Sequence, residues 1–302
     1  DPWSWLEQAR ADVASRGLVR RLDSGAPGLL DLASNDYLGL ARHPAVVAGA
    51  AAAASAYGAG ATGSRLVTGT TELHLALEEA LATWLGAESA LVFSSGYLAN
   101  LGALTVLAGP GTLVVSDSAN HASLIDACRL SRAEVRVVPH GSLGAVEEAL
   151  AGHDGRAVVV TDAVFSVDGS LADLAGLHEV TRRYGGLLLV DEAHGLGVVG
   201  PSGRGACALA GLEHEPDVVR TVTLSKSLGS QGGAVLGPAM LRDHLVDTAR
   251  AFVFDTGLAP PSVGAALAAL PLVTAERVSA LASVGASLAA ALAVPPTPGA
   301  VL

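Results

Sequence analysis

The chain has 302 residues, half of them hydrophobic, and its 29 acidic and 18 basic side chains give a formal net charge of −11. Such a surface repels the phosphate backbone, which argues against nucleic acid as a partner. Cys128 and Cys207 form neither a CxxC pair nor a metal-ligand set, and this fits a reducing cytosol. The uncharged stretch 44–64 is mostly Ala and Gly, too weakly hydrophobic for a membrane span, so we expect a buried helix and loop there. We therefore expect a cytoplasmic protein with no membrane or metal partner, although a chain that begins at Asp1 leaves a removed targeting segment open.

Short Val and Leu runs recur along the chain, each followed by a polar loop and a helical pattern. They span 90–93, 112–116, 135–138, 157–161, 187–190 and 221–224. Continuous apolar runs indicate strands buried on both faces, so we predict an α/β fold with a mostly parallel sheet flanked by helices. We expect residues 1–43 to form an N-terminal helix and arm, 44–238 a large ligand-binding domain, and 239–302 a connecting helix and the start of a smaller C-terminal domain.

Polar side chains follow four of these strands. They are Asp117 and His121, Asp162 to Ser166, Asp191 to His194, and Ser225 with Lys226. Parallel sheets bind ligands at the carboxyl ends of their strands, so we expect the functional site there.

A glycine-rich segment, Gly58-Ala-Gly-Ala-Thr-Gly63, matches the dinucleotide pattern GxGxxG. That pattern requires a strand before it and a helix opening on it. Residues 50–56 have a helical pattern instead, and the next helix starts only at Glu72. We interpret the segment as a substrate or subunit-contact loop that includes Arg65.

Asp191 ends an apolar strand, and three interpretations fit it. An Asp at this position often caps the following turn. Asp191-Glu-Ala-His194 also spells the metal-binding box of DEAH helicases, but the chain has no GxxxxGK[ST] phosphate loop. The third interpretation pairs Asp191 with the pyridine nitrogen of pyridoxal 5′-phosphate (PLP), because a buried carboxylate favours the protonated ring on which that cofactor's chemistry depends.

Lys226 is the only lysine among the 18 basic residues. A bias toward Arg explains the composition, yet not why the one lysine lies directly after a buried strand and before a Gly-rich turn. A desolvated amine loses its proton and forms an imine, whereas Arg stays protonated. The hydroxyls of Thr223 and Ser225 beside it are suitable phosphate donors. Lys226 and Asp191 together therefore indicate a PLP site more specifically than either does alone.

Several motifs, in order, resemble the α-oxoamine synthases, which are fold-type-I PLP enzymes, and they cover nearly the whole chain. They are Ser34-Asn-Asp-Tyr-Leu-Gly-Leu40, Gly58-Ala-Gly-Ala-Thr-Gly-Ser-Arg65, Phe93-Ser-Ser-Gly-Tyr-Leu-Ala-Asn100, His121-Ala-Ser123, Phe165-Ser-Val-Asp-Gly169, Asp191-Glu-Ala-His-Gly195 and Thr223-Leu-Ser-Lys226.

The resemblance implies roles for individual residues. Lys226 would form the Schiff base and act as acid and base, Asp191 would hold the ring nitrogen, and His121 would stack on the ring. His194 and Ser166 would contact the phenolic oxygen of the cofactor. The implied phosphate contacts are Ser95, Gly96, Tyr97 and Thr223. In a homodimer, Thr256 would contact the phosphate in the neighbouring subunit. The implied substrate contacts are Arg20, Asn35 and Arg65.

The surroundings of Lys226 and the segment 252–261 most resemble the family's acyltransferases that condense L-alanine with pimeloyl-CoA, or a pimeloyl carrier protein, in biotin synthesis. A sister synthase using glycine and another acyl-CoA is the alternative, and a noncatalytic PLP-binding homologue is an alternative of another class. The family has a longer C-terminal domain with an Arg that binds the amino acid carboxylate. The sequence stops at Leu302 before it, so we expect either an incomplete record of the chain or a chain without part of its substrate site.

Overall fold

The computed structural model describes the chain except residues 23–27 and 29. The chain divides into two compact units, Asp1–Ser34 and Asn35–Leu302. The first unit contains helix α1 (Trp5–Ser15), none of whose residues is buried. The second unit holds the sheet and the cavity described below, and the predicted boundary at residue 238 stays a prediction.

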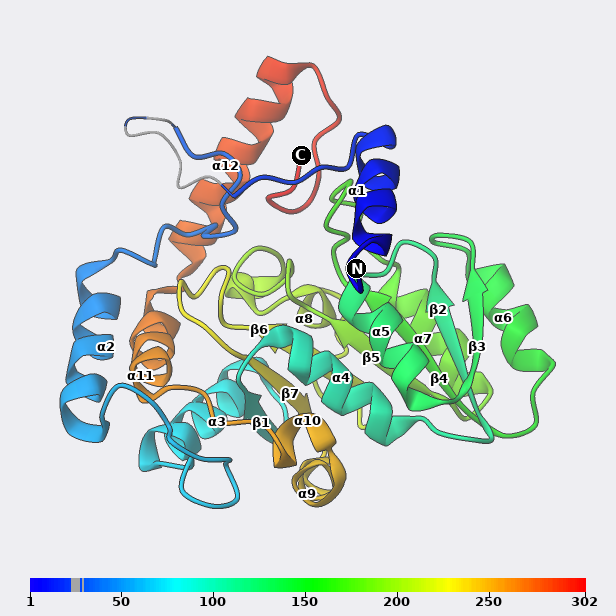
Figure 1. Ribbon diagram of the computed structural model, residues 1–302, viewed down its shortest axis with the longest axis horizontal. Coiled ribbons are helices and arrows are strands. Elements are labelled where there is room, and N and C mark those ends of the chain that lie inside the picture. Colours follow the sequence, from blue (N-terminus) through cyan, green and yellow to red (C-terminus); the bar gives the residue numbers. More distant parts are fainter. Residues whose placement is uncertain (23–27, 29) are drawn as a thin grey trace. The chain divides into compact units, whose positions relative to one another are not determined.

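A seven-stranded sheet forms the centre of the second unit (Figure 1). Its strands are β1 (Ser89–Phe93), β2 (Thr112–Asp117), β3 (Glu134–Val138), β4 (Arg156–Asp162), β5 (Leu187–Asp191), β6 (Val218–Thr223) and β7 (Gly233–Gly237). The order across the sheet is β1-β7-β6-β5-β4-β2-β3. Strands β2 to β6 pair in parallel, and β7 runs antiparallel to both neighbours. The predicted fold class is therefore confirmed, although the sequence did not predict β7, a five-residue strand with glycine at both ends.

Helices cover both faces of the sheet. In the second unit they are α2 (Pro44–Tyr57), α3 (Glu72–Leu85), α4 (Gly96–Leu107), α5 (Ala122–Ser131), α6 (Leu143–Ala151), α7 (Leu174–Arg183), α8 (Ala206–Leu209), α9 (Ala239–Thr248), α10 (Arg250–Val253), α11 (Pro260–Ala269) and α12 (Ala275–Leu292). Alternate strand residues enter different core clusters: Val158 packs with residues of α4 and α5, whereas Val159 packs with residues of α6 and α7. The same alternation determines on which face of the sheet each polar side chain at a strand end lies.

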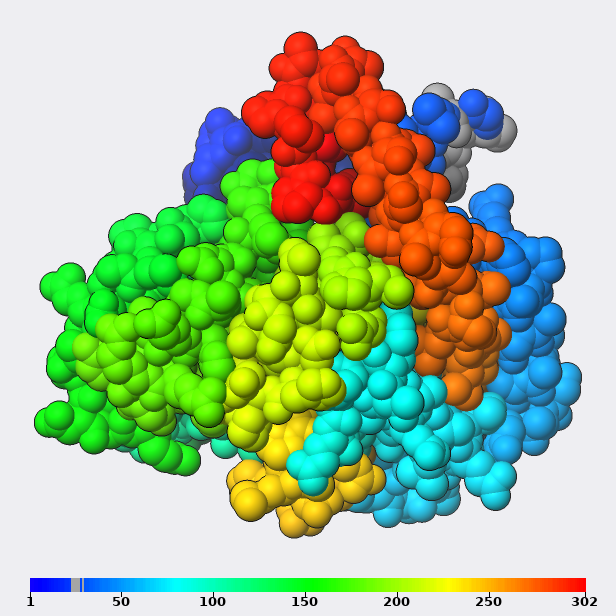
Figure 2. Space-filling model, turned by 180° about the vertical axis from the view of Figure 1, so that it is seen from behind, coloured from blue at the N-terminus to red at the C-terminus, as the bar shows by residue number. Residues whose placement is uncertain are grey.

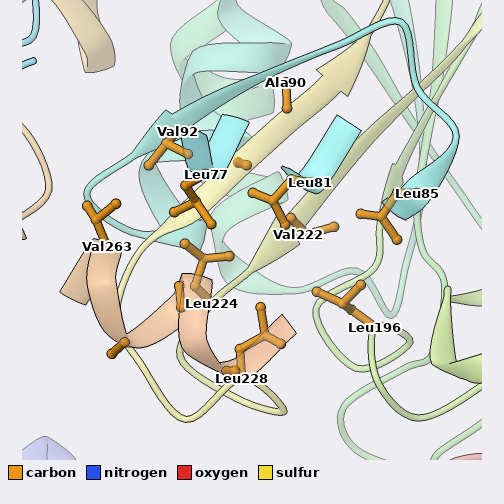
Figure 3. Packing of buried hydrophobic residues seen from close by; sticks show 14 of the residues in the cluster. Leu77, Leu81, Leu85, Ala90, Val92, Leu196, Val222, Leu224, Leu228 and Val263 are labelled. Carbon is orange, nitrogen blue, oxygen red and sulfur yellow. The ribbon is translucent and has the colours of Figure 1, made fainter. Parts of the chain in front are cut away.

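A third cluster of buried apolar residues anchors the chain on both sides of Lys226. Leu224 and Leu228 are fully buried against Leu77 and Leu81 of α3 and Val263 of α11 (Figure 3). Burying two leucines of one short loop stabilises it by roughly 3–6 kcal/mol, at about 1.5–3 kcal/mol for each side chain. The lysine between them is thus carried by a loop that the core holds in place.

Helix α2 is less buried than the sequence suggested. Only Val46 and Ala53 are buried, so the expectation of a buried helix over this stretch is wrong. The helix meets α11 closely along one line, where a Cβ added to Gly49 would lie 2.7 Å from the carbonyl oxygen of Gly264, while most of its other side chains face outward. Because α2 and not a strand precedes Gly58, the rejection of a dinucleotide motif is confirmed.

Helix α12 starts against the rest of the second unit and protrudes from it, and of its residues only Ala289 is buried (Figure 2). Among the described residues it is the one helix whose length and composition suffice to cross a membrane, with a mean hydropathy of 1.2. Length and composition by themselves are weak evidence for a membrane span.

Candidate active site

A cavity of about 240 Å³ opens at the carboxyl ends of β4, β5 and β6, where the sequence predicted the site. It is lined by Ser95, Gly96, Tyr97, Asn100, His121, Ser123, Asp162, Val164, Asp191, Ala193, His194, Thr223, Ser225 and Lys226. Residues from the N-termini of α4 and α5 complete it, because those helices follow β1 and β2 on the same face of the sheet. Lys226 and Asp191 share this cavity, as the sequence predicted.

The amine of Lys226 lies 2.8 Å from Nε2 of His194. Burial lowers the pKa of Lys226, although the charges of Asp191 and Asp162 oppose the shift. Burial and the nearby lysine lower the pKa of His194 to about 4, so its ring is neutral at physiological pH. The cavity therefore favours an amine that gives up its proton and becomes a nucleophile.

Tyr37, a residue given no role from sequence, orients the ring of His194. Its hydroxyl donates to Oδ1 of Asn35 at 3.1 Å and lies 2.5 Å from Nδ1 of His194. Tyr37 and Lys226 thus hold the two ring nitrogens of His194 by hydrogen bonds on opposite sides. Burial raises the pKa of Tyr37 to about 12, so the hydroxyl keeps its proton. Asn35, predicted to face substrate, lies at the exposed end of this chain of hydrogen bonds.

Asp191 is held by two donors at the end of β5. Its Oδ2 accepts from Nδ2 of Asn100 at 2.7 Å, and its Oδ1 accepts from the backbone N–H of Ala193 at 2.9 Å. Two further hydrogen bonds fix Asn100 in turn. The hydroxyl of Thr221 donates to Oδ1 of Asn100 at 2.6 Å, and Nδ2 of Asn100 also donates to the hydroxyl of Ser123. Asn100 was given no role from sequence. The signal that could have found it is an amide side chain in a mostly apolar helix.

His121 forms the N-cap of α5 and lines the cavity. Its Nδ1 lies 2.8 Å from the hydroxyl of Ser123, and its backbone N–H donates to Oδ2 of Asp162 at 3.1 Å. The contact with Ser123 orients the ring of His121, and the contact with Asp162 holds its backbone.

One end of the cavity is suited to an anion. Ser95 caps α4, a helix of 12 residues, so backbone N–H groups and the positive end of the helix dipole meet at Gly96. The hydroxyls of Thr223 and Ser225 lie 2.8 Å apart beside it. A Cβ added to Gly233 would lie 2.5 Å from Cα of Gly96, so β7 and α4 can meet here because residue 233 is glycine.

Five predicted site residues do not line the cavity: Asn35, which lies at the end of the hydrogen bonds described above, and four others. Arg65 is buried elsewhere: its guanidinium bonds Glu78 at 2.8 Å, the carbonyl of Val92 at 3.0 Å and Thr70 at 2.9 Å. With these donors engaged, the geometry favours a structural role for Arg65 over the predicted substrate contact. The other three are Ser166, which is half-buried, Thr256, which is exposed, and Arg20, which is exposed in the first unit.

The chain matches the family model of aminotransferase class I and II over residues 27–299. It is 61% identical over 278 residues to 8-amino-7-oxononanoate synthase of Mycolicibacterium gilvum (strain PYR-GCK), covering 91% of this chain and 73% of that one. Serine palmitoyltransferase (SPT) of Sphingomonas wittichii superposes with a TM-score of 0.81 at 32% identity, covering 91% of this chain and 72% of that one. An SPT structure with its PLP internal aldimine gives a TM-score of 0.86 at 29% identity, covering 97% of this chain and 77% of that one.

The sheet, the cavity and these likenesses define a PLP-dependent enzyme of fold type I. More narrowly, the chain belongs to the 8-amino-7-oxononanoate synthase family.

The residues of the cavity fit the cofactor. A lysine amine and a clamped carboxylate face the same space, and Ser95, Gly96 and Thr223 line it at the N-terminus of α4, which suits a phosphate. The buried Oδ1 of Asp162 has no hydrogen-bond partner among the described residues, and such an oxygen in a lined cavity is suited to a polar ligand.

Proposed function

We propose that this chain uses PLP to condense L-alanine with a pimeloyl thioester, with loss of CO₂, and so makes 8-amino-7-oxononanoate for biotin biosynthesis. The observation that supports this most strongly is the shared cavity of Lys226 and Asp191 in a chain 61% identical to a synthase of that name. The bound cofactor supplies an electron sink that makes the Cα–H bond of the amino acid acidic.

The chain's own residues perform the remaining tasks. Lys226, once its amine is free, would take the proton from Cα of alanine and later return one, because burial lowers the pKa of that amine. Asp191 holds a proton on the ring nitrogen, and Asn100 and Ala193 keep its carboxylate oriented. His121 covers the ring face.

Other residues would bind the cofactor without taking part in proton transfer. Gly96 at the α4 N-terminus, together with Ser95 and Tyr97 and the hydroxyl of Thr223, would hold the phosphate. His194, with Ser166 from the following loop, would contact the phenolic oxygen. Asn35 and Arg20 would contact substrate.

We also propose a cytoplasmic homodimer in which Thr256 completes the partner's phosphate site. The loops around residues 63–69 and 254–257 lie together, since the N–H of Gly257 donates to the carbonyl of Gly63 at 2.9 Å. Val67 and Phe254 on these loops are 80% and 70% exposed, which supports a protein contact there.

The test is an assay in which purified, PLP-loaded protein is mixed with L-alanine and pimeloyl-CoA. The release of CO₂ and of free thiol is measured. We expect equal amounts of both, and only background release with glycine. Faster turnover with glycine and a shorter acyl-CoA would assign the chain to a sister synthase. PLP binding without release of thiol from pimeloyl-CoA or a pimeloyl carrier protein would mark a noncatalytic homologue.

A further inference from the structure

Asp162 lines the cofactor cavity, yet none of the roles above uses it. It ends β4 and is only 3% exposed. Its Oδ2 accepts from the backbone N–H of His121 at 3.1 Å, whereas Oδ1 has no hydrogen-bond partner among the described residues. Leaving a buried polar atom unsatisfied costs about 1–3 kcal/mol, so an oxygen in this position indicates that a bound group completes it.

Asp162 stands directly beside Asp191. The two are registered partners on the parallel strands β4 and β5, so their side chains leave the same face of the sheet from backbones about 4.8 Å apart. Two ionised carboxylates this close repel each other, and one of them takes up a proton. Asp191 accepts two N–H donors and Asp162 only one, so the proton belongs on Asp162.

The other charged groups around Asp162 act in both directions. Burial and the charge of Asp191 raise the pKa of Asp162 to about 8, and Asp117 at the end of β2 adds a little. The N–H of His121 and the positive charge of Lys226 act against that rise. The other titratable side chains that line the cavity are Tyr97, His121 and His194, and of these His194 is neutral at these pH values.

We propose that Asp162 is a proton-carrying residue of the cofactor site, which at neutral pH offers an O–H from Oδ1 to the bound cofactor and through Oδ2 positions His121. This inference rests on the proposed function, because the cavity it concerns is the PLP site. It makes Asp191 the only ionised member of the carboxyl pair, so that one negative charge, and not two, faces the ring.

The Asn variant separates this proposal from a purely structural role. Asparagine resembles a protonated carboxyl group: its oxygen still accepts from His121, and its amide offers N–H to the cavity at every pH. Alanine provides neither group. Asp243→Asn, which changes an exposed carboxylate on α9, is the matched control.

The first measurement is infrared spectroscopy of the protein without added ligand. The wild type should show the C=O stretch of a protonated carboxyl group at neutral pH, and the band should fade as pH rises through about 8. The part of the band that belongs to Asp162 should disappear in Asp162→Asn and remain in Asp243→Asn, so it is read from the spectrum of the wild type minus that of each variant, which cancels any band from the buried Glu192. Absence of a carboxyl band from the wild-type-minus-Asp162→Asn difference spectrum would overturn the proposal.

The second measurement is the dissociation constant for PLP across the same pH range. Asp162→Asn should bind within about threefold of wild type at neutral pH and should lose the weakening that wild type shows above pH 8, whereas Asp162→Ala should bind about tenfold more weakly throughout. If Asp162→Asn and Asp162→Ala bound PLP equally weakly, an ionised carboxylate would be needed at this position, and the proposal would be rejected. A wild type that binds no PLP would refute the proposed function instead, and the infrared band would still report on Asp162.

Discussion

Asp191 and Glu192 are consecutive, buried and acidic, yet they belong to different regions of the molecule. Asp191 opens on the cavity that holds Lys226. Glu192 is sealed on the other side of the strand, where its carboxylate accepts from the backbone N–H groups of Ala206 at 2.9 Å and Cys207 at 2.6 Å. Burial raises the pKa of Glu192, and those two donors oppose the rise.

The glycines around Glu192 show how closely this second region is packed. A Cβ added to Gly205 would lie 2.7 Å from Oε1 of Glu192, and Gly205 has a φ of +94°. The comparison teaches that burial alone does not mark a functional carboxylate. What distinguishes Asp191 is the cavity in front of it, with a reactive amine on the other side.

The largest expected effect is at Lys226. Lys226→Ala should reduce turnover by about 10⁴-fold or more, because both the imine and the proton-transferring amine are lost. Lys226→Arg keeps the positive charge but forms no imine, so it should be equally inactive and lack the visible absorbance of bound PLP. Turnover assays and absorbance spectra decide this, and an active Arg variant would show that charge alone suffices.

Asp191→Asn should come next. It should lower kcat by about 10²- to 10³-fold while changing the free energy of unfolding by only about 1 kcal/mol, since one of its two donors is the side-chain amide of Asn100, which can turn its oxygen toward the new NH₂ group. Steady-state kinetics and urea unfolding measure the two quantities. If Asp191→Asn lost stability rather than turnover, the distinction between the two regions would fail.

Glu192→Gln should show the converse pattern. Its amide would direct N–H at one of the two backbone donors, so the free energy of unfolding should fall by about 1–3 kcal/mol. The kcat of the folded protein should stay within about twofold of wild type, because Glu192 does not line the cavity. A selective loss of kcat in a stable Gln variant would place Glu192 in the active site after all.

The smallest effect concerns His74, another sealed polar group. Its Nε2 lies 2.8 Å from the carbonyl of Leu258, to which it donates, and Nδ1 accepts from the backbone N–H of Thr71 at 3.1 Å. Burial, with the charge of Arg65, lowers the pKa of His74 below 6.5. The unfolded chain therefore binds a proton first, and stability should be lost as pH falls below 6.5 toward the folded pKa, by at most about 1.4 kcal/mol per pH unit.

His74→Gln should flatten that dependence in urea unfolding series, while the exposed His244→Gln should leave it unchanged. The same slope in wild type and His74→Gln would show that His74 does not titrate on unfolding.

The sequence predicted most of the sheet because buried parallel strands are continuous apolar runs, readable one at a time. It did not predict β7, whose alanine, valine and leucine lie between glycines that also suit a loop. Helix α2 was misjudged because a run of alanines shows neither which face packs nor how much of the helix is covered.

By itself, the sequence determined the unique lysine after β6 and the carboxylate at the end of β5, because each follows its own strand. Only the tertiary structure decided what surrounds them. Asn100 reaches Asp191 across 91 residues and Tyr37 reaches His194 across 157, and Asp162 meets Asp191 through strand register. Such partners are set by how separate elements pack, and no local pattern records that. For the same reason only the structure could show that Arg65 is paired with Glu78 in the core.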